Sequence, residues 1–303
     1  MKTYAEYLAQ FFEGKVQKLP IDTARGCPNR DGSIGTGGCS YCINAAFSPD
    51  YGKRALGINE QIARGKKFFA GKYGNMRYLA YFQSETPTNT DLPSQLADYS
   101  EALDPEDIVG LVLATRPDCI PDELIALLVE LPKPVFIEIG AESMHDATLE
   151  RVNRRHTVEQ TVDAVRRCAA AGLHVGLHLI FGLPGEDEEM MLDSVRRINE
   201  LPIESIKFHH LQILRGTELG RQWERDQLRD IISYTPERYT ALCRRVLALL
   251  RPDIAVERFL SQSPRHLVLH PRWNLKPSAF AKALDERLPA AETQDERLPA
   301  AET

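Results

Sequence analysis

The feature that most constrains the fold is an ordered alternation of apolar strands with helical segments. Six strands are expected, each followed by a helical pattern, over residues 15–21, 76–83, 108–114, 134–139, 174–181 and 205–214. Strands that are apolar on both faces suit a parallel sheet covered by helices. Regular alternation implies right-handed crossovers, in an open sheet or in a complete or partial barrel. In either fold, a ligand is expected beyond the carboxyl ends of the strands.

A glycine-rich loop with three cysteines follows the first expected strand. Cys27, Cys39 and Cys42 have the spacing C-x11-C-x2-C, with four glycines between Asp31 and Cys39. Thiolates suit zinc, copper(I) or iron–sulfur clusters, and a glycine-rich backbone can approach a bulky cluster closely. Three thiolates are one too few for a four-thiolate zinc site, and Cys39 with Cys42 could also form a redox pair. A fourth zinc ligand could come from Cys119, Cys168 or Cys243.

Composition and charge narrow the class of protein. The chain has 303 residues, 43% apolar and 26% charged, which is typical of a globular protein with a sizeable core. Much of its net charge of −6 lies in residues 285–303, which hold six acidic and two basic side chains. Proteins that bind nucleic acids usually carry an excess of basic residues. The net charge of this chain therefore does not indicate a nucleic-acid partner, although it does not exclude one.

The amino terminus and the cysteines indicate the compartment. Residues 1–12 form a short amphipathic pattern unlike a signal peptide, and no apolar run approaches the length of a membrane span. We therefore expect a cytoplasmic protein without a membrane partner. Because cytoplasmic thiols are kept reduced, metal or redox chemistry explains the cysteines better than structural disulfides do.

Further polar and glycine-containing segments recur after the expected strands. With the loop CPNRDGSIGTGGCSYC, they read YFQSETPTNT, TRPDCI, IEIGAES, VNRRHT, HLIFGLPGE and KFHHLQILRGTEL. Together these segments resemble the radical S-adenosylmethionine (SAM) superfamily over about residues 15–260. The commonest signature there is C-x3-C-x2-C. The longer spacing is similar to that of the YhcC-type branch and of the radical SAM domain of Elongator-type catalytic subunits.

The alternation and the resemblance together predict an α/β fold. We expect a partial (β/α)6 TIM-like barrel with a short α/β C-terminal extension. The predicted units are an N-terminal helix at 1–14, a core barrel at 15–230 and the extension at 231–280. The remaining residues, 281–303, contain DERLPAAET twice and are expected to be a disordered tail.

The resemblance also implies the chemistry. Cys27, Cys39 and Cys42 would hold three irons of a [4Fe-4S] cluster, and the fourth iron would stay open for SAM. Reductive cleavage of SAM would give a 5′-deoxyadenosyl radical that abstracts hydrogen from an unidentified substrate, either RNA or a small metabolite. The expected electron donor is a flavodoxin or ferredoxin.

Candidate SAM contacts follow residue by residue from the same resemblance. Tyr41 would pack near the adenine and Arg155 would approach the SAM carboxylate. Glu138 would contact the ribose, or else be a buried carboxylate paired with Arg155. Cys119 is a candidate hydrogen-atom donor. The remaining contacts implied by the resemblance are Gln83 and Ser84 at the methionine amine, Ser143 at the ribose, and Ile180 and Gly182 at the adenine.

Two other function classes stay open at this point. The first is a zinc-stabilised α/β binding or scaffold protein, which needs a fourth cysteine or histidine near the loop. The second is a thiol oxidoreductase, which would use Cys39 and Cys42 and would not need Cys27.

Overall fold

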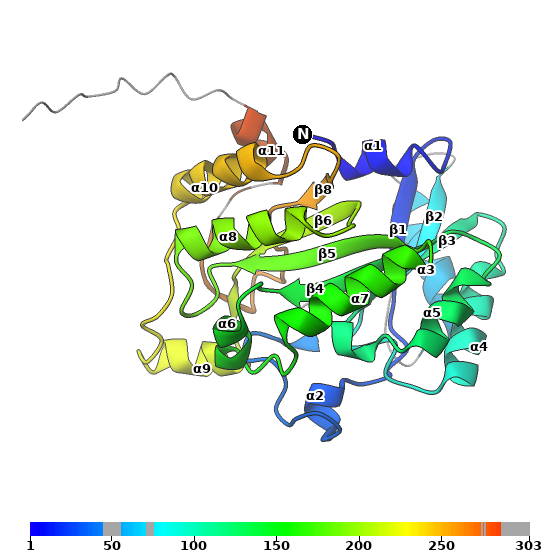
Figure 1. Ribbon diagram of the computed structural model, residues 1–303, viewed down its shortest axis with the longest axis horizontal. Coiled ribbons are helices and arrows are strands. Elements are labelled where there is room, and N and C mark those ends of the chain that lie inside the picture. Colours follow the sequence, from blue (N-terminus) through cyan, green and yellow to red (C-terminus); the bar gives the residue numbers. More distant parts are fainter. Residues whose placement is uncertain (45–55, 71–75, 274, 276, 286–303) are drawn as a thin grey trace, which may run out of the picture.

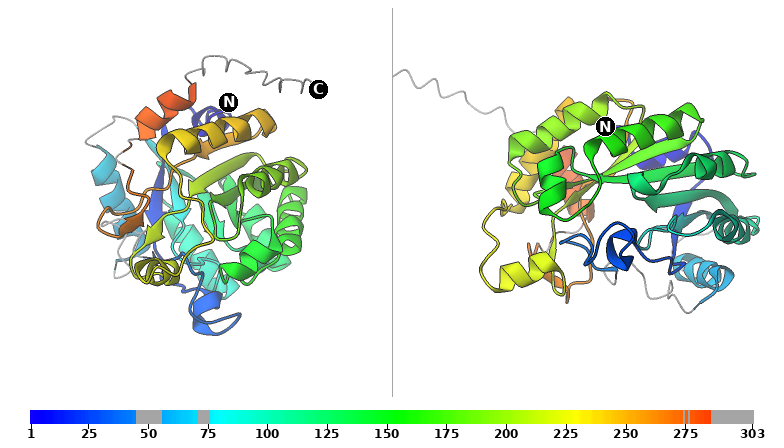
Figure 2. Two further views of the ribbon diagram at one scale, coloured as in Figure 1. Left: turned by 90° about the vertical axis from the view of Figure 1, so that its left-hand side faces the viewer. Right: turned by 60° about the horizontal axis from the view of Figure 1, so that its bottom comes forward.

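The protein is built around one curved sheet of seven parallel strands, in the order β1-β2-β3-β4-β5-β6-β8 (Figure 1). The computed structural model describes residues 1–44, 56–70, 76–273, 275 and 277–285. Figure 2 shows the sheet curling around a central space, so the predicted partial barrel is confirmed. The strands are β1 (Val16–Ile21), β2 (Arg77–Phe82), β3 (Ile108–Thr115), β4 (Val135–Glu142), β5 (His174–Phe181), β6 (Ser205–His210) and β8 (Ala255–Arg258).

The helices between the strands cover the outer face of the sheet. Their apolar sides join the outward-facing strand residues in one large core. Helix starts carry local signals, such as the capping box of Thr157 and Gln160 at α7 and the Thr235 cap before Pro236 at α10. These helices are α3 (Ile58–Ala70), α4 (Leu92–Leu103), α5 (Asp122–Val129), α7 (Val158–Ala170), α8 (Glu188–Asn199) and α10 (Pro236–Leu249).

The amino-terminal end of the barrel is plugged by α1 (Tyr4–Leu8) and the turns after it. Tyr7 and Phe12 pack against inward-facing residues, including Phe136 at the start of β4. The segment also bridges to β8, where the Val256 N–H donates to the Lys2 carbonyl. The described residues thus fill this end of the barrel and leave a pocket at the carboxyl ends of the strands.

The sixth predicted strand divides in two. Residues 205–214 were expected as one strand, but β6 ends at His210, and β7 (Ile213–Leu214) pairs antiparallel with β9 (Val268–His270). Helix α9 (Glu218–Glu224) follows β7 directly. The small β7–β9 sheet ties the C-terminal part of the chain to the carboxyl end of the barrel.

The C-terminal extension adds the seventh strand, β8, and ends in α11 (Pro277–Asp285). Residues 281–285, which were expected to belong to the tail, are helical, because α11 continues through Asp285. Residues 286–303 lie outside the described residues. The short helices α2 (Pro28–Asp31) and α6 (Asp146–Arg151) complete the fold, and among the described helices none has the length and apolarity to cross a bilayer.

Candidate functional site

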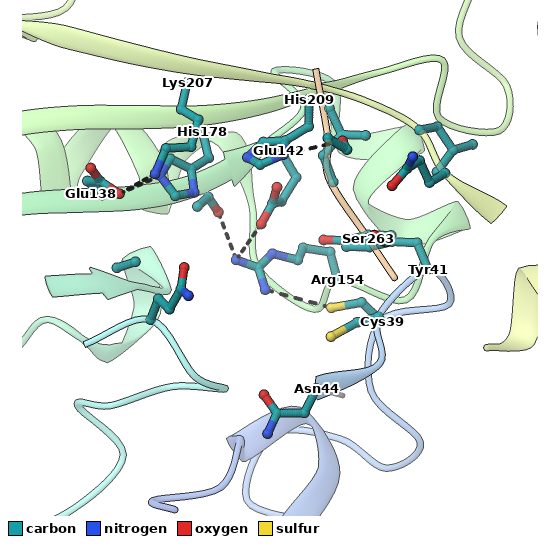
Figure 3. A pocket seen from close by; sticks show the side chains of 18 of the residues that line it. Cys39, Tyr41, Asn44, Glu138, Glu142, Arg154, His178, Lys207, His209 and Ser263 are labelled. Atoms are coloured by element: carbon teal, nitrogen blue, oxygen red, sulfur yellow. Dashed lines mark hydrogen bonds and ion pairs between the residues drawn. The ribbon is translucent and has the colours of Figure 1, made fainter. Parts of the chain in front are cut away.

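A pocket lies at the carboxyl end of the barrel, between the cysteine loop and the strand ends (Figure 3). Cys39 and Tyr41 reach it from the loop after β1, and Arg154 reaches it from the segment before α7. Strand side chains from β4, β5 and β6 form its deeper wall. The pocket is therefore located where parallel βα folds bind ligands.

The cysteine loop is folded by its own backbone. Cys27 precedes α2 as its N-cap residue, and the Cys42 N–H donates to the Cys39 carbonyl at 3.0 Å. Gly38 has φ +76° and lies against Arg30, whose Nε would be 2.7 Å from an added Cβ. Glycine is needed at this point because a side chain would meet both backbone strain and a clash. The loop thus places Cys39 and Cys42 at the pocket wall.

The three loop thiols are free and influence one another electrostatically. Burial, together with the neighbouring Cys39 and Cys27, raises the pKa of Cys42 to about 12, although Arg30 opposes the shift. Ionising Cys42 is therefore favoured by positive charge, which Arg30 contributes and an iron–sulfur cluster would add. Among the described side chains, no three His, Cys, Asp or Glu residues already form a metal-coordinating group.

Arg154, rather than Arg155, reaches the pocket. The Arg154 Nη2 donates to the Gly140 carbonyl at 2.8 Å, its Nη1 lies 3.7 Å from the Cys39 Sγ, and it pairs with Glu142 at 3.3 Å. Its Nε is buried without a hydrogen-bond partner. Arg155 is exposed and donates to Asn153 instead. The sequence analysis did not consider Arg154 as a SAM contact, although it is the adjacent residue of the same motif.

The Arg154 backbone is held by a second buried arginine. The Arg116 Nη2 donates to the Arg154 carbonyl at 2.9 Å and also binds Asp118. Arg116 is 2% exposed and lines the pocket, but the sequence analysis did not single it out. The sequence Arg-Pro-Asp could have indicated it, because this spacing allows the Arg116 guanidinium to make two hydrogen bonds to the carboxylate two residues later.

Some of the other predicted contacts also meet at the pocket. Tyr41 packs in one apolar cluster with Ile180, and the Tyr41 hydroxyl is buried without a hydrogen-bond partner. Gln83 lines the same pocket. Among the described residues, five predicted positions besides Arg155 do not line it: Cys27, Ser84, Cys119, Ser143 and Gly182.

Three of these residues, Cys27, Ser143 and Cys119, have other neighbours. Cys27 is close enough to Cys42 to raise the pKa of that thiol. The Ser143 hydroxyl donates to Glu186, which the sequence analysis missed. The Cys119 Sγ lies 3.8 Å from Asp118, and burial raises the pKa of this thiol to about 12. Its role as a hydrogen-atom donor stays a prediction.

Glu138 is the centre of a buried charge network inside the barrel. Lys18 contacts one carboxylate oxygen, and Lys207 and the Tyr81 hydroxyl each donate to the other at 2.9 Å. The suggested pairing with Arg155 is wrong, because Arg155 is exposed. Burial alone would raise the pKa of Glu138, but Lys18 and Lys207 hold it well below its usual range. The complete network is Lys18, Tyr81, Glu138, His178, Lys207 and Glu257.

Two histidines of β5 and β6 face each other beside this network. The rings of His178 and His209 are 5.6 Å apart, and Figure 3 shows both at the inner wall. His210 points to the opposite side, where its ring stacks on Trp273 at 4.6 Å. Burial holds the pKa of both His178 and His209 below the usual range, so both rings are neutral at pH 7.

Comparison with known proteins gives two family matches. The model of the "Radical SAM superfamily" matches residues 21–198, and that of the "Radical_SAM C-terminal domain" matches residues 203–289. The chain is 32% identical to the Bacillus subtilis protein YtqA, over 93% of this chain and 87% of that protein. It is 35% identical to Escherichia coli YhcC, over 88% of this chain and 85% of that protein.

A solved structure has a similar fold. The Elp3 protein of the archaeon Methanocaldococcus infernus superposes with a TM-score of 0.65 at 17% identity. The superposition covers 84% of this chain and 59% of that chain. At this identity, the likeness concerns the fold alone.

Proposed function

This chain belongs to the radical SAM superfamily, and on that premise we propose that it is an enzyme that turns SAM into a radical acting on a separate substrate. The family cofactors are a [4Fe-4S] cluster and SAM. When bound, they supply one-electron cleavage of the SAM sulfonium bond, which yields a 5′-deoxyadenosyl radical. The substrate class stays open between RNA and a small metabolite.

We assign the cluster to Cys27, Cys39 and Cys42. The observation that carries the proposal is the position of free thiols at the carboxyl end of a parallel barrel, facing a pocket that also holds a buried guanidinium. Soft ligands in a set of three leave one iron open, and the mutual influence of the thiols on the pKa of Cys42 favours a cationic cluster among them.

The remaining SAM contacts are assigned to groups around the same pocket. The unpartnered Nε of Arg154 suits the SAM carboxylate, because a guanidinium fork can bind a carboxylate in two places. Tyr41 and Ile180 offer an apolar surface to the adenine, and Gln83 a polar group to the methionine part. The side chains that surround the pocket would limit contact between the radical and bulk water.

A flavodoxin or ferredoxin is the proposed electron donor, and the cytoplasm the proposed location. All six cysteines are free in the described structure, as expected in a reducing compartment.

The test is anaerobic reconstitution with iron and sulfide, followed by incubation with SAM and dithionite. We expect three to four irons per chain and the release of 5′-deoxyadenosine. The variant Cys39→Ala should lose the cluster, whereas Cys168→Ala, which removes a buried thiol from α7, should retain it.

Other outcomes would point to the alternative classes. Binding of zinc in place of iron would favour the binding or scaffold protein. Dithiol chemistry that survives Cys27→Ala would favour the oxidoreductase. A normal cluster that releases no 5′-deoxyadenosine would overturn the proposal.

A further inference from the structure

A β-bulge in β8 turns two consecutive side chains toward the barrel interior. In the β6–β8 register Ile206 is opposite Val256, but Lys207 is opposite Arg258, so Glu257 is the extra residue. In a regular strand Glu257 and Arg258 would point to opposite faces. With the bulge, Glu257 pairs with Lys207 at 3.1 Å while Arg258 lines the pocket. Bulges beside binding sites commonly redirect side chains in this way.

The interior charges next to Arg258 already compensate one another. Lys18 and Lys207 share Glu138 and Glu257 between them, so two cations face two carboxylates. Within the part of the chain that the structure describes, no carboxylate forms an ion pair with Arg258, and its Nε is buried without a hydrogen-bond partner. Arg258 interacts electrostatically with Glu257, but the two lysines already share that carboxylate. This group therefore holds one cation more than it has carboxylates, and the excess charge is costly at a pocket wall unless a ligand completes it.

The polar groups around Arg258 do not supply a counter-charge. Burial, and then the charge of Arg258, hold the pKa of His209 well below its usual range, so His209 is neutral. The Gln212 Oε1 lies in the same pocket wall, buried and without a hydrogen-bond partner. An excess cation beside a neutral ring, in a pocket whose wall also carries an unpartnered amide oxygen, makes a site for an anion that also carries a hydrogen-bond donor.

This site differs from the proposed cofactor end of the pocket. The groups of the cofactor end lie in the cysteine loop and in the segment before α7, whereas Arg258 comes from the bulged strand β8 and interacts with His209 of β6. We infer that Arg258 binds an anionic oxygen group of the substrate, a carboxylate or a phosphate, on the β6–β8 side of the pocket. This inference rests on the proposed function, because it places a substrate beside the proposed SAM site.

The binding test uses simple anions and a matched neutral compound. Equilibrium dialysis of the reconstituted protein with SAM, but without reductant, measures the binding of benzoate, phenyl phosphate and benzamide. We expect at least one anion to bind at least tenfold more tightly than benzamide. Arg258→Gln should lose this preference, Arg258→Lys should retain part of it, and Arg265→Gln, at an exposed position nearby, should retain all of it.

Each outcome of this test is decisive. Selective binding of benzoate identifies a carboxylate, and selective binding of phenyl phosphate identifies a phosphate. No preference for either anion in the wild type, or equal preference in wild type and Arg258→Gln, overturns the inference. Failure of the proposed function would appear separately, as absence of 5′-deoxyadenosine in its own assay.

A stability measurement covers the case in which Arg258→Gln folds poorly. If Arg258 is kept for a ligand, Arg258→Met should raise the melting temperature measured without added anion by about 2–4 °C, because an uncompensated charge is removed. The anion that binds should then raise the melting temperature of the wild type but not of Arg258→Met. If Arg258→Met instead melts at a lower temperature than Arg265→Met, Arg258 is structural and the inference fails.

Discussion

The two ends of the pocket are built in opposite ways. The proposed cofactor end comes mainly from one continuous segment, Cys27 to Cys42, with Arg154 added from the segment before α7. The deep end takes one side chain from each of several strands that are far apart in the sequence. The network there consists of Lys18, Tyr81, Glu138, His178, Lys207 and Glu257, of which Tyr81, Glu138, His178 and Lys207 line the pocket. A continuous segment can be recognised as a motif, whereas a ring of strand residues becomes visible only in the folded chain.

The two ends also differ in whether their charged and polar groups have partners within the protein. The deep network satisfies its own charges, since its lysines and glutamates pair directly. The cofactor end keeps groups without partners, including the Arg154 Nε and the Tyr41 hydroxyl. Mutations in the deep network should therefore affect folding stability first, and mutations at the cofactor end should affect ligand binding first.

The largest expected effect is on stability, from Glu138→Gln. This change leaves Lys18 and Lys207 with Glu257 as their only carboxylate in the network, so the free energy of unfolding should fall by about 3–5 kcal/mol. Urea unfolding of the cluster-free protein measures it. Glu189→Gln, at an exposed ion pair on α8, should change stability by less than about 0.5 kcal/mol. Equal effects of the two variants would show that the network does not stabilise the barrel.

A second buried carboxyl group, that of Glu186, should make the folding stability depend on pH in the opposite direction to Glu138. Glu186 lies behind the pocket beside Ser143, and burial raises its pKa to about 7. A folded-state pKa above the unfolded value means that stability is greatest at low pH. The contribution of Glu186 to the free energy of unfolding should decline by about 3 kcal/mol between about pH 4.5 and 7. Glu138 has the opposite sign, because its lowered pKa removes stability as the pH falls.

Glu186→Gln tests this sign. The variant should lose the decline in stability between pH 5 and 7, as measured by urea unfolding at a series of pH values. An unchanged slope would mean that Glu186 ionises normally in the folded protein.

At the cofactor end, two neighbouring arginines provide a matched pair. Arg154→Gln should raise the Kd for SAM about 10- to 100-fold, the equivalent of about 1.5–3 kcal/mol for hydrogen bonds to a charged group. Arg155→Gln removes the same charge one residue later, at an exposed position, and should leave the Kd within about twofold. Equilibrium dialysis with the reconstituted protein, and its iron content as a control, measures both. A larger increase in Kd for Arg155→Gln than for Arg154→Gln would show that Arg155 is the SAM contact.

Arg155 was predicted to reach the pocket, but Arg154 does so. The difference has a local cause that sequence patterns do not reveal. Asn153 and Arg155 both adopt left-handed backbone conformations, with φ of 54° and 65°. These two positions turn the chain so that Arg154 points inward and Arg155 points outward. Such conformations are uncommon for residues other than glycine, so neither periodicity nor propensity predicts them.

The sheet was largely predictable because its strands are buried on both faces and alternate with helices. The break after His210 was not, because residues 205–214 are apolar enough to be read as one strand. β7 separates from β6 to pair with β9, a partner more than fifty residues later in the chain. Glu138 was recognised as a carboxylate that needs a partner, but Lys18 and Lys207 are neighbours only after the barrel closes.

The smallest expected effect lies in the helix that begins just after Arg154. Thr157 caps α7 by accepting from the Gln160 N–H, and Gln160 accepts in return from the Thr157 N–H. Thr157→Ala should therefore cost about 1 kcal/mol of unfolding free energy, measured by urea unfolding, while Thr157→Ser retains the cap and should cost less. If Thr157→Ala also weakened SAM binding as strongly as Arg154→Gln does, the helix start and the guanidinium would form one cooperative unit. The distinction between stability residues and binding residues would then fail at this end of the pocket.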